Sequence, residues 1–452
     1  MDKFTSWIDR NQDRIQKEYF DFLKFKSIGT DPQYKGDTLA CACWVRDYLS
    51  RSGMQSELIE TVGHPVVFAE NLHAGPSAHT LLIYGHYDVQ PVDPIELWHS
   101  PPFEPEVRDG IIYARGAVDD KGQIFYAMQA VLAFKELEER LPINLKFCIE
   151  GEEESGSLGL TRALPQLKSR LKCDSLLVPD FDLLSADVPA ISLGARGIVT
   201  LEVTLIGSDT DLHSGLHGGL AYNPNRALVE LLAQLYDADG HIQVPGFYDD
   251  VELMNEEEKN LFSYLDHPDA YKDAFKIRAL GGEKGRSMKE ANWFRPTLEI
   301  NGIAGGYAGP GFKTVIPSRA HAKISCRLVP NQDPEKIGRS VAEFLRSHVA
   351  RGMEIDVQVE KGERAFRSRA DSRLARAVSD SYSDVMGQPC RRQLTGGSIP
   401  IIAELMRSVS EEVVGMGYGL LSDQIHAPNE HFDMQRFNKG IRTVAQTIQR
   451  LK

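Results

Sequence analysis

The chain has 452 residues, more than one hydrophobic core usually supports, so we expect about two or three domains. Hydrophobic residues make up 42% of the sequence and charged residues 25%, ordinary values for a globular protein that exclude a disordered, collagenous or membrane-embedded chain. There are 51 lysines and arginines against 64 aspartates and glutamates, and the formal net charge of -13 argues against a nucleic-acid partner.

The N-terminal segment, residues 1–25, mixes charged and apolar residues at helical spacing, which predicts an amphipathic helix. It has no continuous apolar segment of the kind that a signal peptide needs. No stretch of the chain approaches the roughly 18 uninterrupted apolar residues of a membrane span. We therefore expect a cytoplasmic protein. The six cysteines form no C-x-x-C pair, and we expect reduced thiols without a catalytic role.

The next part of the chain alternates between helix and strand patterns, as in an α/β sheet. Three of its compact apolar runs lead directly into His or carboxylate residues: HTLLIYGHYDV, the run before EGEEESGS, and the run before Pro179 and Asp180. The carboxyl ends of strands in such a sheet commonly carry the functional groups. The expected helices cover 37–52 and 121–138, and the expected strands cover 54–60, part of 79–89, 143–149 and 175–178.

From about Gly197 the pattern changes to that of an α+β domain. We therefore expect a discontinuous catalytic domain of residues 1–196 and 366–452, with a mixed sheet flanked by helices, and an inserted lid or dimerisation domain of residues 197–365. Within the insertion we expect strands at 198–207 (IVTLEVTLIG), 295–300, 321–329 and 354–359, helices at 225–236 and 333–350, and a long polar helical stretch at 252–273. An αβ pattern returns from 371 to 452.

Single polar residues at strand ends are usually caps, turn formers or solvated side chains. Here, however, two histidines and several carboxylates follow segments that otherwise look buried, and imidazole nitrogen and carboxylate oxygen both bind zinc. Asp119 in GAVDDKG is a candidate to bridge two metal ions, because each carboxylate oxygen can bind one of them. The adjacent Glu153 and Glu154 suit a division of labour, in which one binds metal and the other takes a proton from metal-bound water.

Several motifs together resemble the dinuclear zinc peptidases and deacylases, the family that includes carnosinase, the cytosolic non-specific dipeptidase, succinyl-diaminopimelate desuccinylase and aminoacylase. The likeness covers nearly the whole chain. The motifs occur in the family's order: GHYDV, ARGAVDDKG, EGEEESGS, VPD, DLHSG, GFKTVIPSRA, SCRLVP, GGSIP and IHAPNE.

The resemblance implies a catalytic site with two Zn²⁺ ions per chain, or Mn²⁺ or Co²⁺ in their place. It implies Glu153 as the general base and Asp88 as the carboxylate that orients the ring of His86. It also implies a cis peptide bond between Asp119 and Asp120. The implied ligands of one metal are His86, Asp119 and Asp180, and those of the other are Asp119, Glu154 and His426.

The resemblance assigns further roles to residues of the insertion and of the Gly-Gly-Ser loop. His213 in DLHSG corresponds to a histidine that the partner subunit of a homodimer supplies to polarise the scissile carbonyl. Arg327 would bind the C-terminal carboxylate of the substrate, for which a guanidinium offers bidentate geometry. Thr314 and Ser398 match positions that help to hold the same end of the substrate.

The resemblance predicts hydrolysis of the amide bond in dipeptide-sized substrates by a water molecule that the two metals activate. Two other functions stay open at this point. The enzyme could release the acyl group of an N-acyl amino acid, as a deacylase or desuccinylase does. Alternatively, the chain could bind peptides without hydrolysing them, although every proposed ligand is present.

Overall fold

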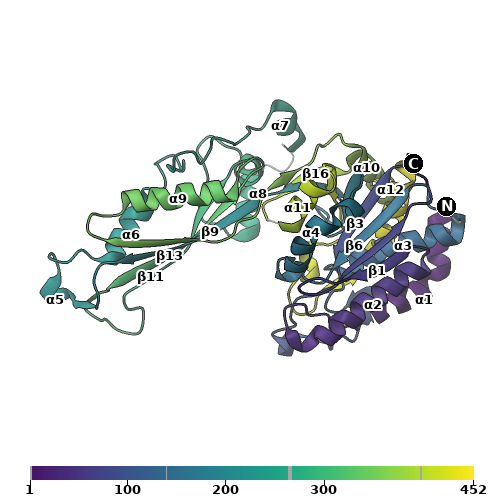
Figure 1. The fold of residues 1–452 in the computed structure, drawn as a ribbon, viewed down its shortest axis with the longest axis horizontal. Coiled ribbons are helices and arrows are strands. Elements are labelled where there is room, and N and C mark those ends of the chain that lie inside the picture. Colours follow the sequence, from purple (N-terminus) through teal and green to yellow (C-terminus); the bar gives the residue numbers. More distant parts are fainter. Residues whose placement is uncertain (1–2, 139, 263–266, 398–399) are drawn as a thin grey trace. The chain divides into compact units, whose positions relative to one another are not determined.

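The computed structural model of the chain describes residues 3–138, 140–262, 267–397 and 400–452 (Figure 1). The chain separates into two compact units. None of the described helices is long and apolar enough to cross a membrane. Unit 1 comprises Met1–Gly194, Arg367–Gln393 and Ile401–Lys452, and unit 2 comprises Ala195–Phe366 and Leu394–Pro400.

The main feature of unit 1 is a large mixed sheet in the order β1-β2-β6-β3-β7-β17-β8-β15, with β16 paired to β8. Its neighbouring strands β6, β3, β7 and β17 run parallel to one another. At one edge of the sheet, β2 pairs antiparallel with β6, and β1 pairs antiparallel with β2. The strands are β1 (Gln55–Ile59), β2 (Val66–Asn71), β3 (Thr80–His86), β6 (Asn144–Glu150), β7 (Ser175–Val178), β8 (Ala190–Ala195), β15 (Phe366–Arg367), β16 (Arg391–Thr395) and β17 (Val413–Gly415).

Helices flank this sheet, and α3 is the most deeply buried of them. It packs against α1, α12 and β3, and 13 of its 18 residues are buried, with apolar residues in the majority. Phe125 of α3 contacts the rings of Tyr19, Phe22, Trp44, Tyr48 and Phe437. The helices are α1 (Lys3–Leu23), α2 (Lys35–Arg51), α3 (Lys121–Glu138), α4 (Leu158–Leu171), α10 (Arg373–Met386), α11 (Pro400–Ser408) and α12 (Met434–Arg450).

Short elements connect the layers of unit 1. A small antiparallel sheet joins a segment near the C-terminus to the segment that precedes α3. It consists of β4 (Glu106–Arg108), β5 (Ile111–Tyr113) and β18 (His431–Asp433). Short 3-10 helices cover Pro32–Tyr34, Ile95–Leu97, Glu153–Ser155 and Leu421–Asp423.

Unit 2 has an antiparallel sheet in the order β11-β13-β9-β14, with α6 and α9 packed on one of its faces (Figure 1). Burial alternates along β9, as expected for a sheet that is covered on one face. The elements are β9 (Gly197–Ile206), β10 (Leu212–His213), α5 (Ser214–His217), α6 (Pro224–Ala233), α7 (Glu256–Phe262), α8 (Pro268–Phe275), a π-helix (Glu290–Phe294), β11 (Thr297–Gly305), β12 (Val315–Ile316), β13 (Arg319–Leu328), α9 (Pro334–His348) and β14 (Glu354–Val359).

The mixed sheet flanked by helices confirms the predicted fold class. The prediction of one long polar helix over residues 252–273 is wrong, because the structure has the shorter helices α7 and α8 there. Proline has no backbone N–H and fits best at the first position of a helix, and Pro268 begins α8. The predicted helix over 225–236 ends earlier, at Ala233, and Tyr236 instead forms a β-bridge with Ile242.

Candidate active site

The candidate site lies at the carboxyl edge of the parallel strands of unit 1. His86 is the last residue of β3, and the 3-10 helix that contains Glu153 and Glu154 follows β6. Asp180 comes two residues after the end of β7. Because β6, β3 and β7 are parallel neighbours, their carboxyl ends meet and bring these side chains together.

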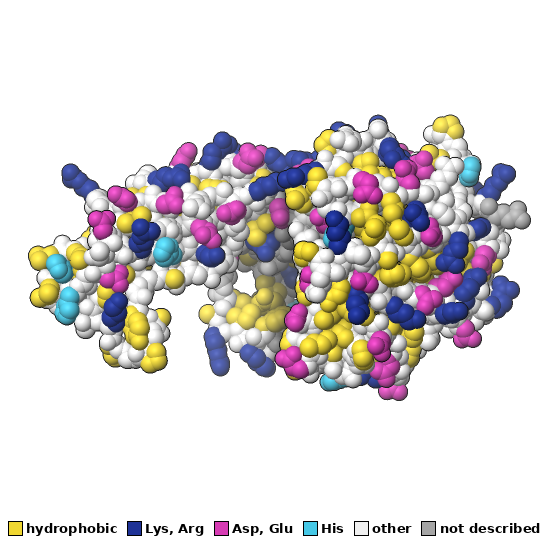
Figure 2. Space-filling view, turned by 60° about the horizontal axis from the view of Figure 1, so that its bottom comes forward, with side chains coloured by type: hydrophobic (Ala, Val, Ile, Leu, Met, Phe, Trp, Pro, Cys, Tyr) yellow, Lys and Arg dark blue, Asp and Glu magenta, His cyan; other side chains and the backbone are white. Residues whose placement is uncertain are grey.

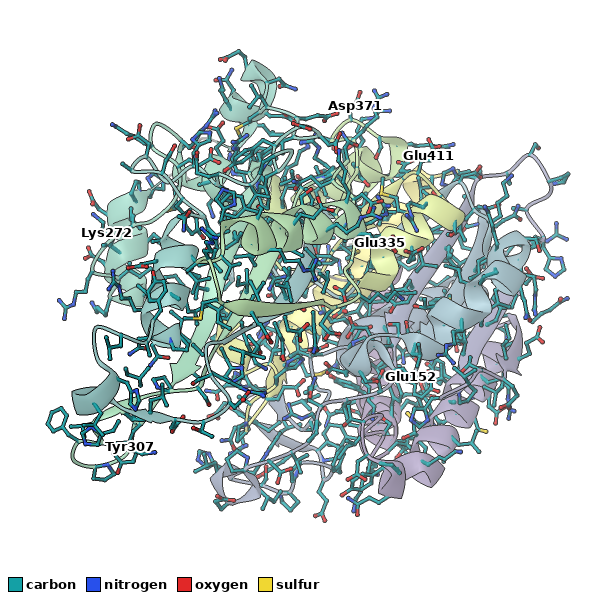
Figure 3. The ribbon with its side chains drawn as sticks, turned by 60° about the vertical axis from the view of Figure 1, so that its left-hand side comes forward. Glu152, Lys272, Tyr307, Glu335, Asp371 and Glu411 are labelled. Atoms are coloured by element: carbon teal, nitrogen blue, oxygen red, sulfur yellow. The ribbon has the colours of Figure 1, made fainter. Side chains whose placement is uncertain are left out.

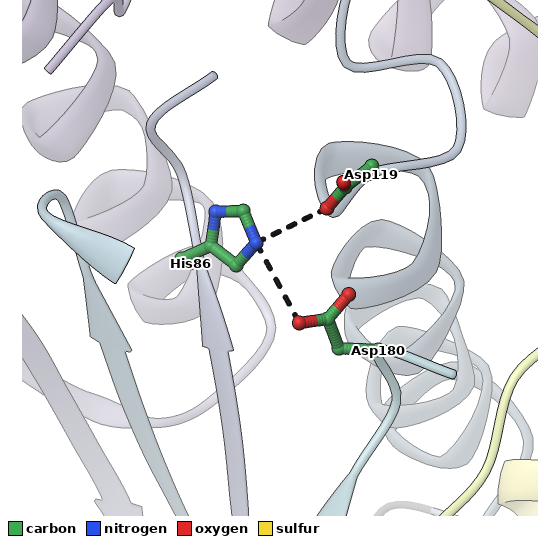
Figure 4. A group of neighbouring side chains, drawn as sticks. All are labelled: His86, Asp119 and Asp180. Atoms are coloured by element: carbon green, nitrogen blue, oxygen red, sulfur yellow. Dashed lines mark ion pairs between the residues drawn. The ribbon is translucent and has the colours of Figure 1, made fainter. Parts of the chain in front are cut away.

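One group of possible metal ligands consists of His86, Asp119 and Asp180 (Figure 4). Nε2 of His86 lies 3.3 Å from Oδ1 of Asp119 and 3.6 Å from Oδ2 of Asp180. The His86 side chain is fully buried, and its Nε2 has no hydrogen-bond partner among the described residues. A buried imidazole nitrogen that faces two carboxylates in this way can bind a cation.

A second group consists of Asp119, Glu154 and His426. Nε2 of His426 lies 2.8 Å from Oδ2 of Asp119 and 3.2 Å from Oε2 of Glu154. Asp119 therefore belongs to both groups and directs a different oxygen toward each histidine. In each group the possible ligand atoms lie within 4.8 Å of one another, which is compatible with two cations that share one carboxylate.

The acidic residues of the site are largely shielded from water, and this burial, together with their neighbours' charges, shifts their pKa values. Burial raises the pKa of Asp180 well above its usual value, and the neighbouring carboxylates Asp120 and Asp119 raise it further. Burial alone would raise the pKa of Asp119 too, but its hydrogen bond with His426 and the nearby charge of His86 lower it. The same hydrogen bond to Asp119, together with one to Glu154, raises the pKa of His426 to about 10. A buried cluster with this excess of carboxylates favours the binding of cations.

Glu153 differs from its neighbour Glu154. Its Oε2 lies 4.0 Å from Nε2 of His86, and it belongs to neither ligand group. Burial raises the pKa of Glu153 to about 7, with a further contribution from the charge of Glu154. A carboxylate beside a metal site, with a pKa near neutrality, suits a group that accepts and returns a proton.

Asp88 is fully buried and connects His86 with the loop that carries the two glutamates. Its Oδ1 lies 3.3 Å from Nδ1 of His86 and accepts a hydrogen bond from the backbone N–H of Glu153 at 3.3 Å. Its Oδ2 accepts the backbone N–H of Glu154 at 3.2 Å. Nδ1 of His86 also lies 3.1 Å from the backbone carbonyl oxygen of Asp88, so the backbone and the carboxylate of Asp88 both orient the His86 ring. The carboxylate at the same time fixes the backbone from which Glu153 and Glu154 project.

The remaining predicted residues belong to unit 2. His213 is exposed and caps α5, and its Nδ1 accepts a hydrogen bond from the backbone N–H of Gly215 at 3.0 Å. Thr314 lies beside it, because its carbonyl oxygen accepts the N–H of Ser214 at 3.0 Å. Arg327 is half-buried on β13, opposite Thr297 of β11 and Ile198 of β9. Ser398 lies outside the described residues.

Three polar residues of the site were not singled out from the sequence. Nε2 of Gln90 donates a hydrogen bond to Oε2 of Glu154 at 2.7 Å, and Oδ2 of Asp120 accepts the backbone N–H of His86 at 3.1 Å. Glu430 accepts four hydrogen bonds from the segment that carries Asp119. Gln90 lies in GHYDVQ, Asp120 in VDDKG and Glu430 in IHAPNE. Their position beside predicted site residues is the sequence signal that could have identified them. The peptide bond between Asp119 and Asp120 is cis, as the resemblance implied.

A carboxylate shared between two histidine-containing groups, with a further glutamate beside it, defines the class of dinuclear metallohydrolases. The comparison with known families is specific. The model described as Peptidase family M20/M25/M40 matches residues 82–450, and the chain belongs to this family. It is therefore a metallopeptidase that hydrolyses amide bonds, and the two ligand groups are the candidate positions for its metal ions.

Individual relatives match almost the full length of the chain. The human Beta-Ala-His dipeptidase is 30% identical over 98% of this chain and 91% of its own length. The Cys-Gly metallodipeptidase of Schizosaccharomyces pombe is 28% identical over 98% of this chain and 96% of its own length. Among solved structures, the M20 family metallo-carboxypeptidase Sso-CP2 from Sulfolobus solfataricus superposes with a TM-score of 0.82 at 32% identity, covering 97% of this chain and 99% of that one.

Proposed function

We propose that this enzyme hydrolyses the peptide bond of dipeptides with a water molecule activated by two zinc ions. The observation that carries the proposal is the arrangement of Asp119, whose two oxygens face separate ligand groups, with Glu153 beside them but outside both. An arrangement that only stored metal would not require a further glutamate next to the ligands but outside both groups.

The donor set fits zinc, because each group offers one imidazole nitrogen and two carboxylates. His86, Asp119 and Asp180 would hold one ion, and Asp119, Glu154 and His426 the other. Bound zinc lowers the pKa of a coordinated water to about 7 and polarises a carbonyl. Oxygen and nitrogen donors also accept Mn²⁺ or Co²⁺, which are the alternatives to zinc.

The protein's own residues handle the proton. Glu153 accepts a proton from the attacking water and delivers it to the leaving amine, so the catalysed step needs no covalent enzyme intermediate. Asp88 keeps the Nδ1 side of His86 occupied, which directs Nε2 toward Asp119 and Asp180.

The names of the relatives support dipeptides as substrates, since two of them are a Beta-Ala-His dipeptidase and a Cys-Gly metallodipeptidase. They do not favour the deacylase that the sequence left open. In the proposed complex, Arg327 binds the C-terminal carboxylate of the dipeptide through its guanidinium, with help from Thr314 and Ser398.

A side-by-side turnover assay tests this function. The purified full-length protein, loaded with zinc or manganese, is offered a panel of dipeptides, tripeptides, N-acetyl amino acids and succinyl-diaminopimelate. We expect the highest kcat/KM with dipeptides, and no turnover by Glu153→Gln of the same metal content. Activity on the acyl substrates alone would overturn the proposal, and preference for the longer peptides would indicate a carboxypeptidase instead.

We further propose a homodimer in which each chain supplies His213 to the active site of its partner, where the ring polarises the scissile carbonyl. Exposed apolar side chains of unit 2, among them Leu216 of the helix that His213 caps, support a second copy of the chain as the occupant of this surface (Figure 2). Figure 3 shows one of them, Tyr307, at the outer edge of unit 2. These side chains include Leu216 (71% exposed), Leu220 (84%), Ile303 (55%), Tyr307 (48%) and Phe312 (104%).

Co-expression of two inactive variants tests the shared site. His213→Ala keeps Glu153, and Glu153→Gln keeps His213, so a mixed dimer contains one complete site. Random pairing makes half of the dimers mixed, and we expect about a quarter of the wild-type activity. Activity no higher than that of either variant alone would contradict the supply of His213 by the partner chain.

The cytoplasmic location expected from the sequence stays a prediction.

A further inference from the structure

Glu430 is a buried glutamate that is not among the proposed ligands and has no assigned role. Its side chain is 1% exposed. Its Oε1 accepts the backbone N–H groups of Val118 at 2.9 Å and Asp119 at 3.1 Å. Its Oε2 accepts the N–H of Gly116 at 2.9 Å and Nη1 of Arg115 at 2.8 Å. One side chain therefore holds most of the short segment that delivers Asp119.

The segments around Asp119 and His426 have little regular structure of their own. His426 lies between a 3-10 helix and β18, in a loop where Gln424, His426 and Asn429 have positive φ. Asp119 lies between β5 and α3. No helix or long strand therefore fixes the separation of these two residues, although Oδ2 of Asp119 and Nε2 of His426 lie only 2.8 Å apart.

The two segments are joined at Glu430 through both its backbone and its side chain. His431 pairs with Tyr113 in the small sheet, and the N–H of Ala114 donates to the carbonyl oxygen of Glu430 at 3.1 Å. The strand pairing stops there, and the Glu430 side chain continues the connection to the next residues of the segment. Since Glu430 follows His426 by four residues, its carboxylate couples the position of His426 to that of Asp119.

The surroundings require a carboxylate at this position. Every described contact of the side chain comes from a donor, three of them backbone N–H groups and one a guanidinium. Gly116 has a φ of 81°, a conformation that favours glycine. Arg115 balances the buried charge and is itself fixed, because its Nη2 donates to the carbonyl oxygen of Pro91 at 2.9 Å and its guanidinium lies 5.3 Å from the ring of Trp98.

We propose that Glu430 is a positioning residue for the dinuclear site: it sets the bridging carboxylate of Asp119 relative to His426, so the affinity of the Asp119, Glu154 and His426 position for metal depends on it. The inference rests on the proposed function, because it takes these residues as ligands. Groups that orient metal ligands from outside typically contribute about 10- to 100-fold to metal affinity.

Glu430→Gln is the direct test. The amide has nearly the same shape, but its NH₂ group must face either Arg115 and Gly116 or Val118 and Asp119, and both pairs are donors. We expect one zinc ion to stay tightly bound and the second to bind about 10- to 100-fold more weakly than in the wild type. Chelator competition with zinc measures both affinities, and elemental analysis after dialysis gives the number of ions per chain.

Glu283→Gln is the matched control, because Glu283 also forms a buried pair with an arginine, Arg295 at 2.8 and 2.9 Å, but belongs to unit 2. We expect this variant to keep two ions with wild-type affinity. Thermal unfolding of the metal-free proteins measures any general loss of stability separately from metal binding.

A Glu430→Gln variant that binds both ions with wild-type affinity would overturn the inference, even if its metal-free form unfolds at a lower temperature. If this variant does not fold, Glu430→Asp supplies the test, since it keeps the charge but is one methylene too short to reach the same donors. We expect it to lose second-site affinity as well, and unchanged affinity would again overturn the inference. A wild-type protein that binds no metal would contradict the proposed function itself.

Discussion

Replacement of Asp88 by Asn should impair the enzyme although Asp88 is not a metal ligand. Its carboxylate receives three contacts, from Nδ1 of His86 and from the backbone N–H groups of Glu153 and Glu154, at 3.2 to 3.3 Å. Asparagine turns one of the two oxygens into a donor, so at least one of the three donors then faces another donor. A buried hydrogen bond to a charged group contributes about 1.5–3 kcal/mol.

If this loss affects the transition state in full, kcat/KM should fall by about 10- to 150-fold. The assay is steady-state hydrolysis of a dipeptide by zinc-loaded wild-type and variant protein, with metal content determined on the same samples. Asp88→Glu is a useful companion, because it keeps the charge but displaces it. A variant Asp88→Asn with full metal content and kcat/KM within about twofold of the wild type would refute the assigned contacts.

Three further predictions follow from the site and the core. Glu153→Gln should lower kcat by about 10² to 10⁴-fold while leaving the metal content unchanged, since it removes the group that carries the proton; unchanged turnover would eliminate Glu153 as the base. Removal of metal by a chelator should abolish activity and lower the unfolding temperature reversibly, because ions at one hundred times their Kd add about 2.7 kcal/mol of stability; an unfolding temperature that does not respond to added zinc would contradict this. Phe125→Ala should cost about 3–5 kcal/mol in urea unfolding, because the ring contacts aromatic rings of α1, α2 and α12; a cost below about 1 kcal/mol would contradict that packing.

The sequence predicts the elements that are rich in buried apolar residues. The helix Lys121–Glu138 and the strand Ser175–Val178 have the predicted bounds. The positions of His86 and Asp180 could also be predicted from the sequence, since parallel strands place their carboxyl ends at one edge of the sheet.

Other features depend on contacts that a sequence does not display. The role of Glu430 rests largely on backbone N–H groups more than 300 positions away, and every residue except proline has such a group. The polar region after Glu252 misled the prediction, because its charges occur at helical spacing but Pro268 begins a separate helix. The adjacent Glu153 and Glu154 suggested a division of labour, and the resemblance assigned Glu154 to the ligands and Glu153 to the base; the structure likewise has Glu154 in a ligand group and Glu153 outside it.

The most direct test of the central claim is a titration of the metal-free full-length protein with zinc, in which bound metal and dipeptide hydrolysis are measured on the same samples. We predict two ions per chain, with activity that rises as both ligand groups fill and that Glu153→Gln lacks at the same metal content. Fewer than about one ion per chain, with no hydrolysis after zinc or manganese is added, would contradict a dinuclear metallopeptidase and indicate a protein that binds peptides without cleaving them.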